Sequence, residues 1–91
     1  MPIAVHFNPP GMTSAQYDEA MKRLSATGAL PSPGFISHTC YGAKDKLCVV
    51  DVWESEAQFR AFGQQLMPIL TAVGIDPGPP MIQPVHNRVT A

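Results

Sequence analysis

The sequence predicts an α+β domain in which two helices cover one side of a four-stranded antiparallel sheet. Four short stretches rich in apolar and β-branched residues are expected to form strands, at residues 3–7, 35–41, 47–53 and 81–89. Two longer stretches carry helix caps and a helical repeat of apolar residues. The order strand, helix, strand, strand, helix, strand is the ferredoxin-like arrangement. We therefore expect residues 1–91 to form a single domain of this class.

The first strand and helix are marked by local signals. The strand at residues 3–7 stops at the turn cluster of residues 8–11, which contains two prolines and a glycine. Thr13 and Gln16 then have the spacing of a capping box, and Gly28 is placed to end the helix. The buried stripe of this helix is predicted to be Tyr17, Ala20, Met21 and Leu24. We interpret Tyr17 and Tyr41 as packing residues, whose apolar bodies suit the helix stripe and the hairpin.

The next two strands should form a hairpin, because only the polar residues 42–46 separate them. If the turn is centred between Lys44 and Asp45, His38 lies opposite Asp51. The residues that would then share their face are Ile36, Cys40, Val49 and Trp53. If the turn is centred on Lys44, Cys40 pairs with Cys48 and His38 faces Val50. A shift of one residue moves every side chain to the other face, so both registers remain open.

The second helix should start after Ser55, which with Gln58 forms another capping pattern, and should end at Gly74. Its apolar stripe is predicted to be Phe59, Phe62, Leu66, Ile69, Leu70 and Val73. Pro68 removes one backbone hydrogen bond and is expected to kink or restart this helix. Pro84 places the last strand, residues 81–89, at a sheet edge or a bulge.

Composition limits the partners of the chain. Only 14% of residues are charged, below the usual ~25%, which favours burial of surface in a homodimer. Six Lys and Arg balance seven Asp and Glu without a basic run, so we expect no nucleic-acid or membrane partner. No window approaches the ~18 apolar residues of a membrane span, and a cytoplasmic location is expected. The two cysteines favour reduced thiols, and neither a metal site nor a cofactor is predicted.

Two titratable residues in apolar strands are the candidate catalytic groups. The imidazole of His38 can act as a general base, and in one register the carboxylate of Asp51 would hold its tautomer. The alternative is a core histidine that is hydrogen-bonded to a neighbouring hydroxyl or backbone group, with Asp51 at a solvent-exposed edge or accepting backbone hydrogen bonds. The candidate ligand contacts are Trp53, Phe62, Asn8 and His86. For three of these a structural role is the alternative: core packing for Trp53, a turn cap for Asn8 and an edge or dimer contact for His86.

The chain also resembles the dimeric α+β barrel superfamily, and within it the branch of antibiotic-biosynthesis monooxygenases. The resemblance rests on Val50, Val52, Trp53, Glu54 and Ser55 followed by Phe59 and Phe62, on Gly34 before the strand of His38, and on residues 84–87. It spans nearly the whole chain. It implies a homodimer with a pocket between sheet and helices, lined by the Trp. The oxygenase and heme-degrading branches often carry a His about nine residues after that Trp, where this chain has Phe62.

The predicted function is binding of a small, largely apolar aromatic or carbonyl compound, with metal-free oxidation or isomerisation of it. His38 and Asp51 would manage the proton, and Trp53 and Phe62 would form the wall of the pocket. A non-catalytic binding or assembly module with a filled pocket is the alternative. Heme binding is a weaker third hypothesis, because the second helix has no His.

Overall fold

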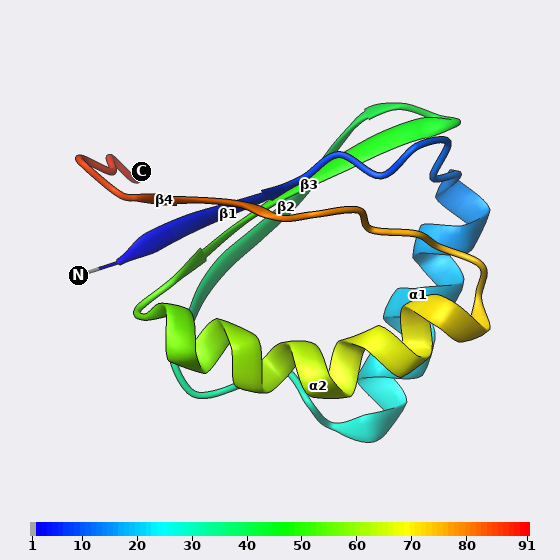
Figure 1. The fold of residues 1–91 in the computed structure, drawn as a ribbon, viewed down its shortest axis with the longest axis horizontal. Coiled ribbons are helices and arrows are strands. Elements are labelled where there is room, and N and C mark those ends of the chain that lie inside the picture. The colour runs from blue at the N-terminus through cyan, green and yellow to red at the C-terminus, as the bar shows by residue number, and fades with distance from the viewer. Residues whose placement is uncertain (1) are drawn as a thin grey trace.

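The predicted fold class is confirmed by a computed structural model, which describes residues 2–91. The sheet has the order β2-β3-β1-β4, and every neighbouring pair of strands is antiparallel. Both helices lie on one face of it (Figure 1). The elements are β1 (Ile3–Phe7), α1 (Ser14–Thr27), β2 (Phe35–Ala43), β3 (Lys46–Trp53), α2 (Glu56–Ala72) and β4 (Met81–Pro84).

Helix α1 begins and ends where its caps predict. The Thr13 side chain accepts from the backbone N–H of Gln16 at 3.1 Å, and the Gln16 side chain accepts from the backbone N–H of Thr13 at 3.0 Å. This reciprocal pair satisfies two backbone donors that the first turn leaves free. At the other end Gly28 adopts φ 70°, the left-handed conformation that ends helices.

The hairpin of β2 and β3 has the first of the two possible registers. Lys44 and Asp45 form its turn, and His38 lies opposite Asp51. The expectation that Ile36 shares the face of His38 and Asp51 is wrong. The register shifts between residues 35 and 37, so Phe35 lies opposite Trp53. A bulge of this kind sets two residues against one, and it brings Phe35 in place of Ile36 to the face of the helices.

The second helix does not restart at Pro68, which was one of the two expected outcomes, because α2 continues through this proline from residue 56 to residue 72. A proline at this position leaves only the carbonyl of Gln64 without its helical donor. Both residues are exposed, so water can bind that carbonyl and the helix need not break. The helix starts as predicted, with the Ser55 side chain accepting from the backbone N–H of Gln58 at 3.3 Å.

The last strand is shorter than predicted. It lies at the sheet edge beside β1, as Pro84 indicates, but it ends at that proline instead of continuing to residue 89. Proline has no N–H to donate to a ladder, and Pro84 closes the pairing with Ile3. The N–H of Val85 still donates to the carbonyl of Pro2 at 2.9 Å. Beyond this bond the chain leaves the sheet (Figure 1).

The core lies between the sheet and the two helices. Val5 and Trp53 are completely buried at its centre, and Trp53 packs against Phe59 and Phe62 of α2 with ring centroids 6.1 and 5.2 Å apart. A second cluster of Met12, Ala20 and Ile75 closes the end of the core near the hairpin turn. The core leaves the opposite face of the sheet without a covering layer among the described residues (Figure 1).

Candidate active site

A chain of hydrogen-bonded side chains crosses the interface between α1 and the sheet. The hydroxyl of Tyr17 lies 2.6 Å from Nε2 of His38, and Nδ1 of His38 lies 2.5 Å from Oδ1 of Asp51. The indole N–H of Trp53 donates to the other carboxylate oxygen, Oδ2, at 3.3 Å. Each hydrogen bond follows from the fold. The register of the hairpin pairs His38 with Asp51, and alternation along β3 places Trp53 on the same face as Asp51. Helix α1 packs on this face and brings Tyr17 into contact with His38.

The chemistry of the partners fixes where the protons lie. An ionised carboxylate only accepts hydrogen bonds, so Nδ1 of His38 carries a proton and donates it to Asp51. In a neutral imidazole the other nitrogen, Nε2, is then an acceptor, and the hydroxyl of Tyr17 donates to it. The phenol ring stacks parallel to the imidazole, with an interplanar angle of 2°. Both nitrogens of His38 are therefore occupied, and the oxygen of Tyr17 is the group at the end of the chain.

The phenol of Tyr17 is held in its protonated form. Its pKa is raised from 10.0 to about 12, first because burial disfavours the phenolate, and further by the nearby Cys40 thiol and Asp51 carboxylate. At neutral pH the hydroxyl is consequently a stable donor to His38. A phenolate oxygen of such high pKa is also a strong base.

Tyr17, His38 and Asp51 all line a cavity of about 70 Å³ between the sheet and the helices. The surface of this cavity is almost entirely apolar, and its other lining residues are apolar as well. They are Phe7, Pro9, Met12, Ala20, Met21, Leu24, Leu30, Phe35, Val49, Phe62, Leu66, Leu70, Ile75 and Pro77. An apolar chamber with a few convergent polar groups is the usual form of a small-molecule site. The volume is about half that of an engineered ~150 Å³ cavity that accepts benzene, so a larger ligand requires side chains to move.

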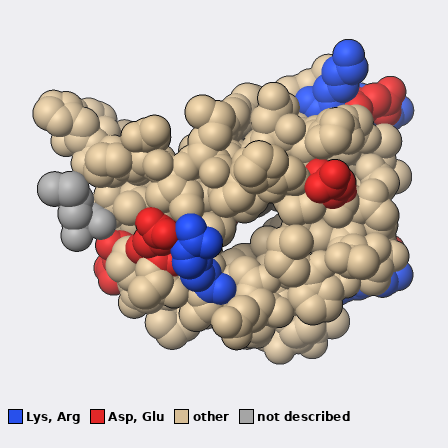
Figure 2. Space-filling model, in the orientation of Figure 1, with Lys and Arg blue, Asp and Glu red and all other residues tan. Residues whose placement is uncertain are grey.

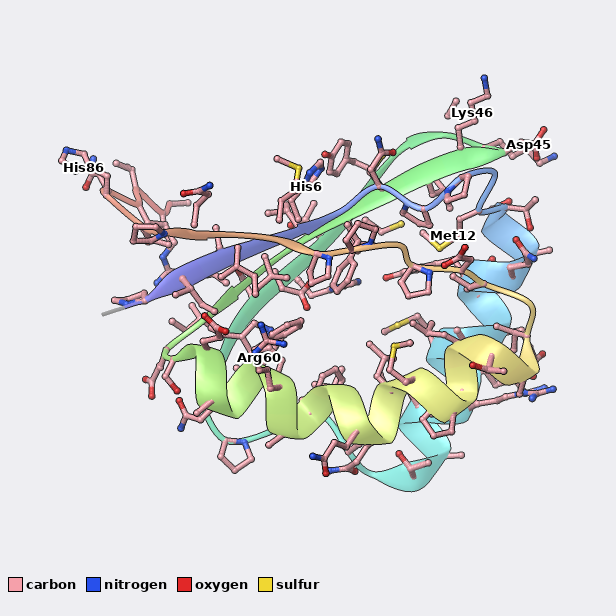
Figure 3. All side chains as sticks on the ribbon, in the orientation of Figure 1. His6, Met12, Asp45, Lys46, Arg60 and His86 are labelled. Carbon is pink, nitrogen blue, oxygen red and sulfur yellow. The ribbon has the colours of Figure 1, made fainter. Side chains whose placement is uncertain are left out.

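A wider groove adjoins this cavity between α2 and the segment that leads into β4. Its volume is about 350 Å³, within the range of roughly 300–1,000 Å³ typical of ligand pockets. Phe7, Leu66, Leu70 and Pro77 line both spaces, so these four side chains form the partition between them. Figure 2 shows the surface hollowed in this region, with atoms of a Lys or Arg at the edge of the hollow. Figure 3, in the same orientation, labels Arg60 there.

The structure brings together four of the six residues singled out in the sequence. His38 and Asp51 bond to each other and line the cavity, and Phe62 lies in its wall. Trp53 is completely buried behind the cavity and supports the carboxylate of Asp51 instead of lining the pocket.

Asn8 and His86 lie away from this site. Asn8 is exposed at the end of β1, where its side-chain oxygen accepts from the thiol of Cys48 at 3.1 Å. His86 is exposed beyond β4, at the end of the molecule remote from the hairpin turn (Figure 3). Neither residue lines the cavity or the groove.

Tyr17 is the site residue that the sequence analysis did not identify. It was assigned to core packing because it begins the apolar stripe of α1. The stripe also provides the missed signal: a residue on that face must meet the sheet, and the sheet face contains His38. A hydroxyl on a buried stripe opposite a polar strand residue predicts a hydrogen bond between the two.

Within residues 2–91, no three His, Cys, Asp or Glu side chains gather where they could hold a metal ion. Phe62, nine residues after Trp53, packs against that residue with ring centroids 5.2 Å apart, and α2 contains no histidine. No helix in the described part of the chain has the length and apolar character required to span a bilayer.

Comparison with solved structures shows which known proteins share this fold. The chain resembles SnoaB, a cofactor-independent oxygenase from Streptomyces nogalater, with a TM-score of 0.65 and 19% identity over 99% of this chain and 96% of that one. The ActVA-Orf6 monooxygenase of Streptomyces coelicolor, in complex with Nanaomycin D, has a TM-score of 0.55 and 21% sequence identity, over 99% of this chain and 90% of that one. The heme-degrader MhuD of Mycobacterium tuberculosis has a TM-score of 0.52 and 20% sequence identity, over 99% of this chain and 100% of that one.

No protein-family model matches the sequence, and no curated protein matches it either. The identities to the solved structures are low, so the likeness is one of fold. It extends over at least 90% of each of these three chains. The chain therefore has the ferredoxin-like α+β fold of the antibiotic-biosynthesis monooxygenases, as the sequence resemblance implies.

Proposed function

We propose that this protein binds a small, largely apolar aromatic or carbonyl compound and removes a proton from it, as a cofactor-independent monooxygenase or an isomerase. The observation that carries the proposal is the hydrogen-bonded chain Tyr17–His38–Asp51, whose three residues line an apolar cavity. Such a chain relays a proton from the cavity to an imidazole whose positive charge a carboxylate stabilises. The fold shared with a cofactor-independent oxygenase agrees with this chemistry.

The proposed reaction begins at the oxygen of Tyr17. It accepts a proton from a phenol or from a carbon next to a carbonyl group, while its own proton passes to Nε2 of His38. The imidazolium formed in this way is stabilised by Asp51, whose carboxylate already accepts from Nδ1 at 2.5 Å. Because Tyr17 hands its proton on as it gains one, no free phenolate is required, and its raised pKa is no obstacle.

The substrate anion then has two possible fates. In an isomerase, the relay returns the proton to a different atom of the substrate. In a monooxygenase, the anion reduces dioxygen: one oxygen atom bonds to the substrate carbon and the other leaves as water. A substrate carbon that changes from CH₂ to C=O supplies all four electrons, so no separate reductant is needed. In both cases the apolar wall excludes water from the anion.

The test is a thermal-shift screen against polycyclic phenols, quinols and small oxo-acids, followed by oxygen uptake with any ligand found. Tyr17→Phe and His38→Ala should lower turnover by roughly 10²-fold or more, the usual contribution of general acid–base catalysis. Tyr41→Phe is the matched control, because it removes another tyrosine hydroxyl that contacts a histidine, His6, on the other face of the sheet. Turnover that survives both cavity variants would disprove the relay.

We further propose that the protein is a homodimer joined through the open face of the sheet. Strand alternation places only one charged side chain on this face, Lys46 at the hairpin end of β3, and Tyr41 and Met81 on it are 44% and 61% exposed. The set consists of Ala4, His6, Ser37, Thr39, Tyr41, Ala43, Lys46, Cys48, Val50, Val52, Met81 and Gln83. A sheet face that is uncharged away from its hairpin end and has no covering layer favours packing against a second copy.

A non-catalytic module is the second candidate, and the small volume of the cavity favours it. At about 70 Å³ the cavity is well below the size of typical ligand pockets, as a filled interior requires. The same screen separates the two candidates, because a non-catalytic dimer gives no shift with any aromatic compound. A hemin titration belongs in the panel, and an unchanged Soret band would dispose of the heme hypothesis.

A further inference from the structure

We infer that the substrate carries an anionic group, a carboxylate in chemical class, at the end opposite its reactive proton, and that Arg60 binds this group at the rim of the groove. The inference rests on the proposed function, since it assumes that the reactive end lies at Tyr17. It adds a recognition site on α2 that the relay does not require. Three observations carry it: the cavity and the groove lie side by side, the charge is distributed unevenly along them, and the side chain of Arg60 is held only by an exposed ion pair.

The two spaces together form a container for an elongated molecule. The inner cavity of about 70 Å³ admits only part of an aromatic compound, and the outer groove of about 350 Å³ holds the remainder. Leu66 and Leu70 of α2 line both spaces, and their side chains must change rotamer so that one ligand can occupy both. A ligand that reaches Tyr17 in this way leaves its other end in the groove.

Charge along this path favours one orientation of an anionic ligand. The inner end holds the carboxylate of Asp51, only 6% exposed, which repels a second negative charge. Within the described structure, Arg60 is the one charged residue that lines the groove. Its side chain extends from α2 toward the sheet (Figure 3). A carboxylate on the ligand is therefore drawn to the rim, which leaves the uncharged end of the ligand to enter the cavity.

Arg60 is free to change partners. It contacts Glu56 one turn earlier on α2 at 2.7 Å, but the two side chains are 61% and 50% exposed. Exposed pairs of this spacing contribute little to stability, so a ligand carboxylate can share or replace Glu56 at small cost. The guanidinium has five N–H donors in a planar fork, which suits a carboxylate bound through both oxygens. Gln64, one turn further along α2, also lines the groove and offers an amide donor.

The experiment compares two probes of similar shape, p-coumaric acid and its methyl ester, which differ in this charge and by one methyl group. Both carry a phenol at one end of an elongated apolar body, and only the acid is anionic at the other end. Their dissociation constants would be measured by calorimetry at neutral pH for the wild type, Arg60→Gln and Arg23→Gln. Arg23 is the matched control, because it forms the same kind of exposed pair, with Glu19 at 2.9 Å, on α1 outside the groove.

The expected result is that the wild type and Arg23→Gln bind the acid roughly fivefold more tightly than the ester, equivalent to about 1 kcal/mol. Arg60→Gln should bind the two probes equally, and added salt should reduce the preference of the wild type. Equal binding of both probes by the wild type, or a preference that persists in Arg60→Gln, overturns the inference. The proposed site would still stand in that case if Tyr17→Phe weakened binding of the ester. Failure of the wild type to bind either probe overturns the inference as well.

Discussion

Replacement of Asp51 by asparagine tests the centre of the proposed site. The carboxylate is 6% exposed and accepts from two donors, Nδ1 of His38 at 2.5 Å and Nε1 of Trp53 at 3.3 Å. Asparagine keeps the shape but has one oxygen, so it can accept from only one of these donors. Its NH₂ group then points at the other N–H, and two donors face each other in a buried place.

The expected cost is the loss of one hydrogen bond to a charged group, about 1.5–3 kcal/mol of unfolding free energy. With a urea dependence of about 1.5 kcal/mol per molar, the midpoint should fall by roughly 1–2 M. The measurement is urea denaturation followed by tryptophan fluorescence, at a fixed protein concentration because a dimer's stability depends on it. Trp53, the only tryptophan, is itself a partner of Asp51 and reports on this site.

The matched control is Asp45→Asn at the exposed turn of the hairpin, labelled in Figure 3, which should change stability by less than about 0.5 kcal/mol. A double-mutant cycle with Trp53→Phe separates the two bonds, because residues that share a hydrogen bond do not give additive effects. If Asp51→Asn costs no more than the control, the carboxylate is not held by both donors. The relay would then lose its stabilising group.

Three further predictions concern the cavity, the phenol and the open sheet face. Phe62→Ala removes a ring that is 4% exposed and should lower the free energy of unfolding by about 3–5 kcal/mol. Met67→Ala on the same helix, where the side chain is 46% exposed, should lower it far less. A similar loss of stability in both variants would contradict the packing of the cavity wall. The pKa of Tyr17, raised from 10.0 to about 12, makes a contribution to stability that is complete below pH 10 and lost as the pH rises to 12. The fall in melting temperature over this range should therefore be shallower in Tyr17→Phe and unchanged in Tyr41→Phe; equal slopes in Tyr17→Phe and the wild type would argue against burial of the phenol. Val50→Glu places a charge on the open face and should yield a monomer in light scattering, while Val50→Thr should remain dimeric; a dimer in both would locate the contact elsewhere.

The elements of the fold are determined locally, and for that reason the sequence alone predicted them. Thr13, Ser55 and Gly28 act through backbone groups within one turn of their own positions, so their effect on a helix end does not depend on the rest of the chain. Alternation along β1 and β3 likewise assigns side chains to faces from spacing alone. Local rules failed where the surroundings decide the outcome, as at Pro68, whose freed carbonyl can bind water on an exposed face, and at Pro84, which ends the last strand.

The site was only half determined in this way. The sequence supplied His38 and Asp51 and the two registers that would join or separate them, but the choice between registers needed the turn at Lys44 and Asp45. The contact of Tyr17 with His38 joins residues on different elements, and no spacing along the chain encodes the angle at which α1 crosses the sheet. The cavity and the groove depend only on tertiary packing, because they are the small volumes that the packed side chains of the core leave unfilled.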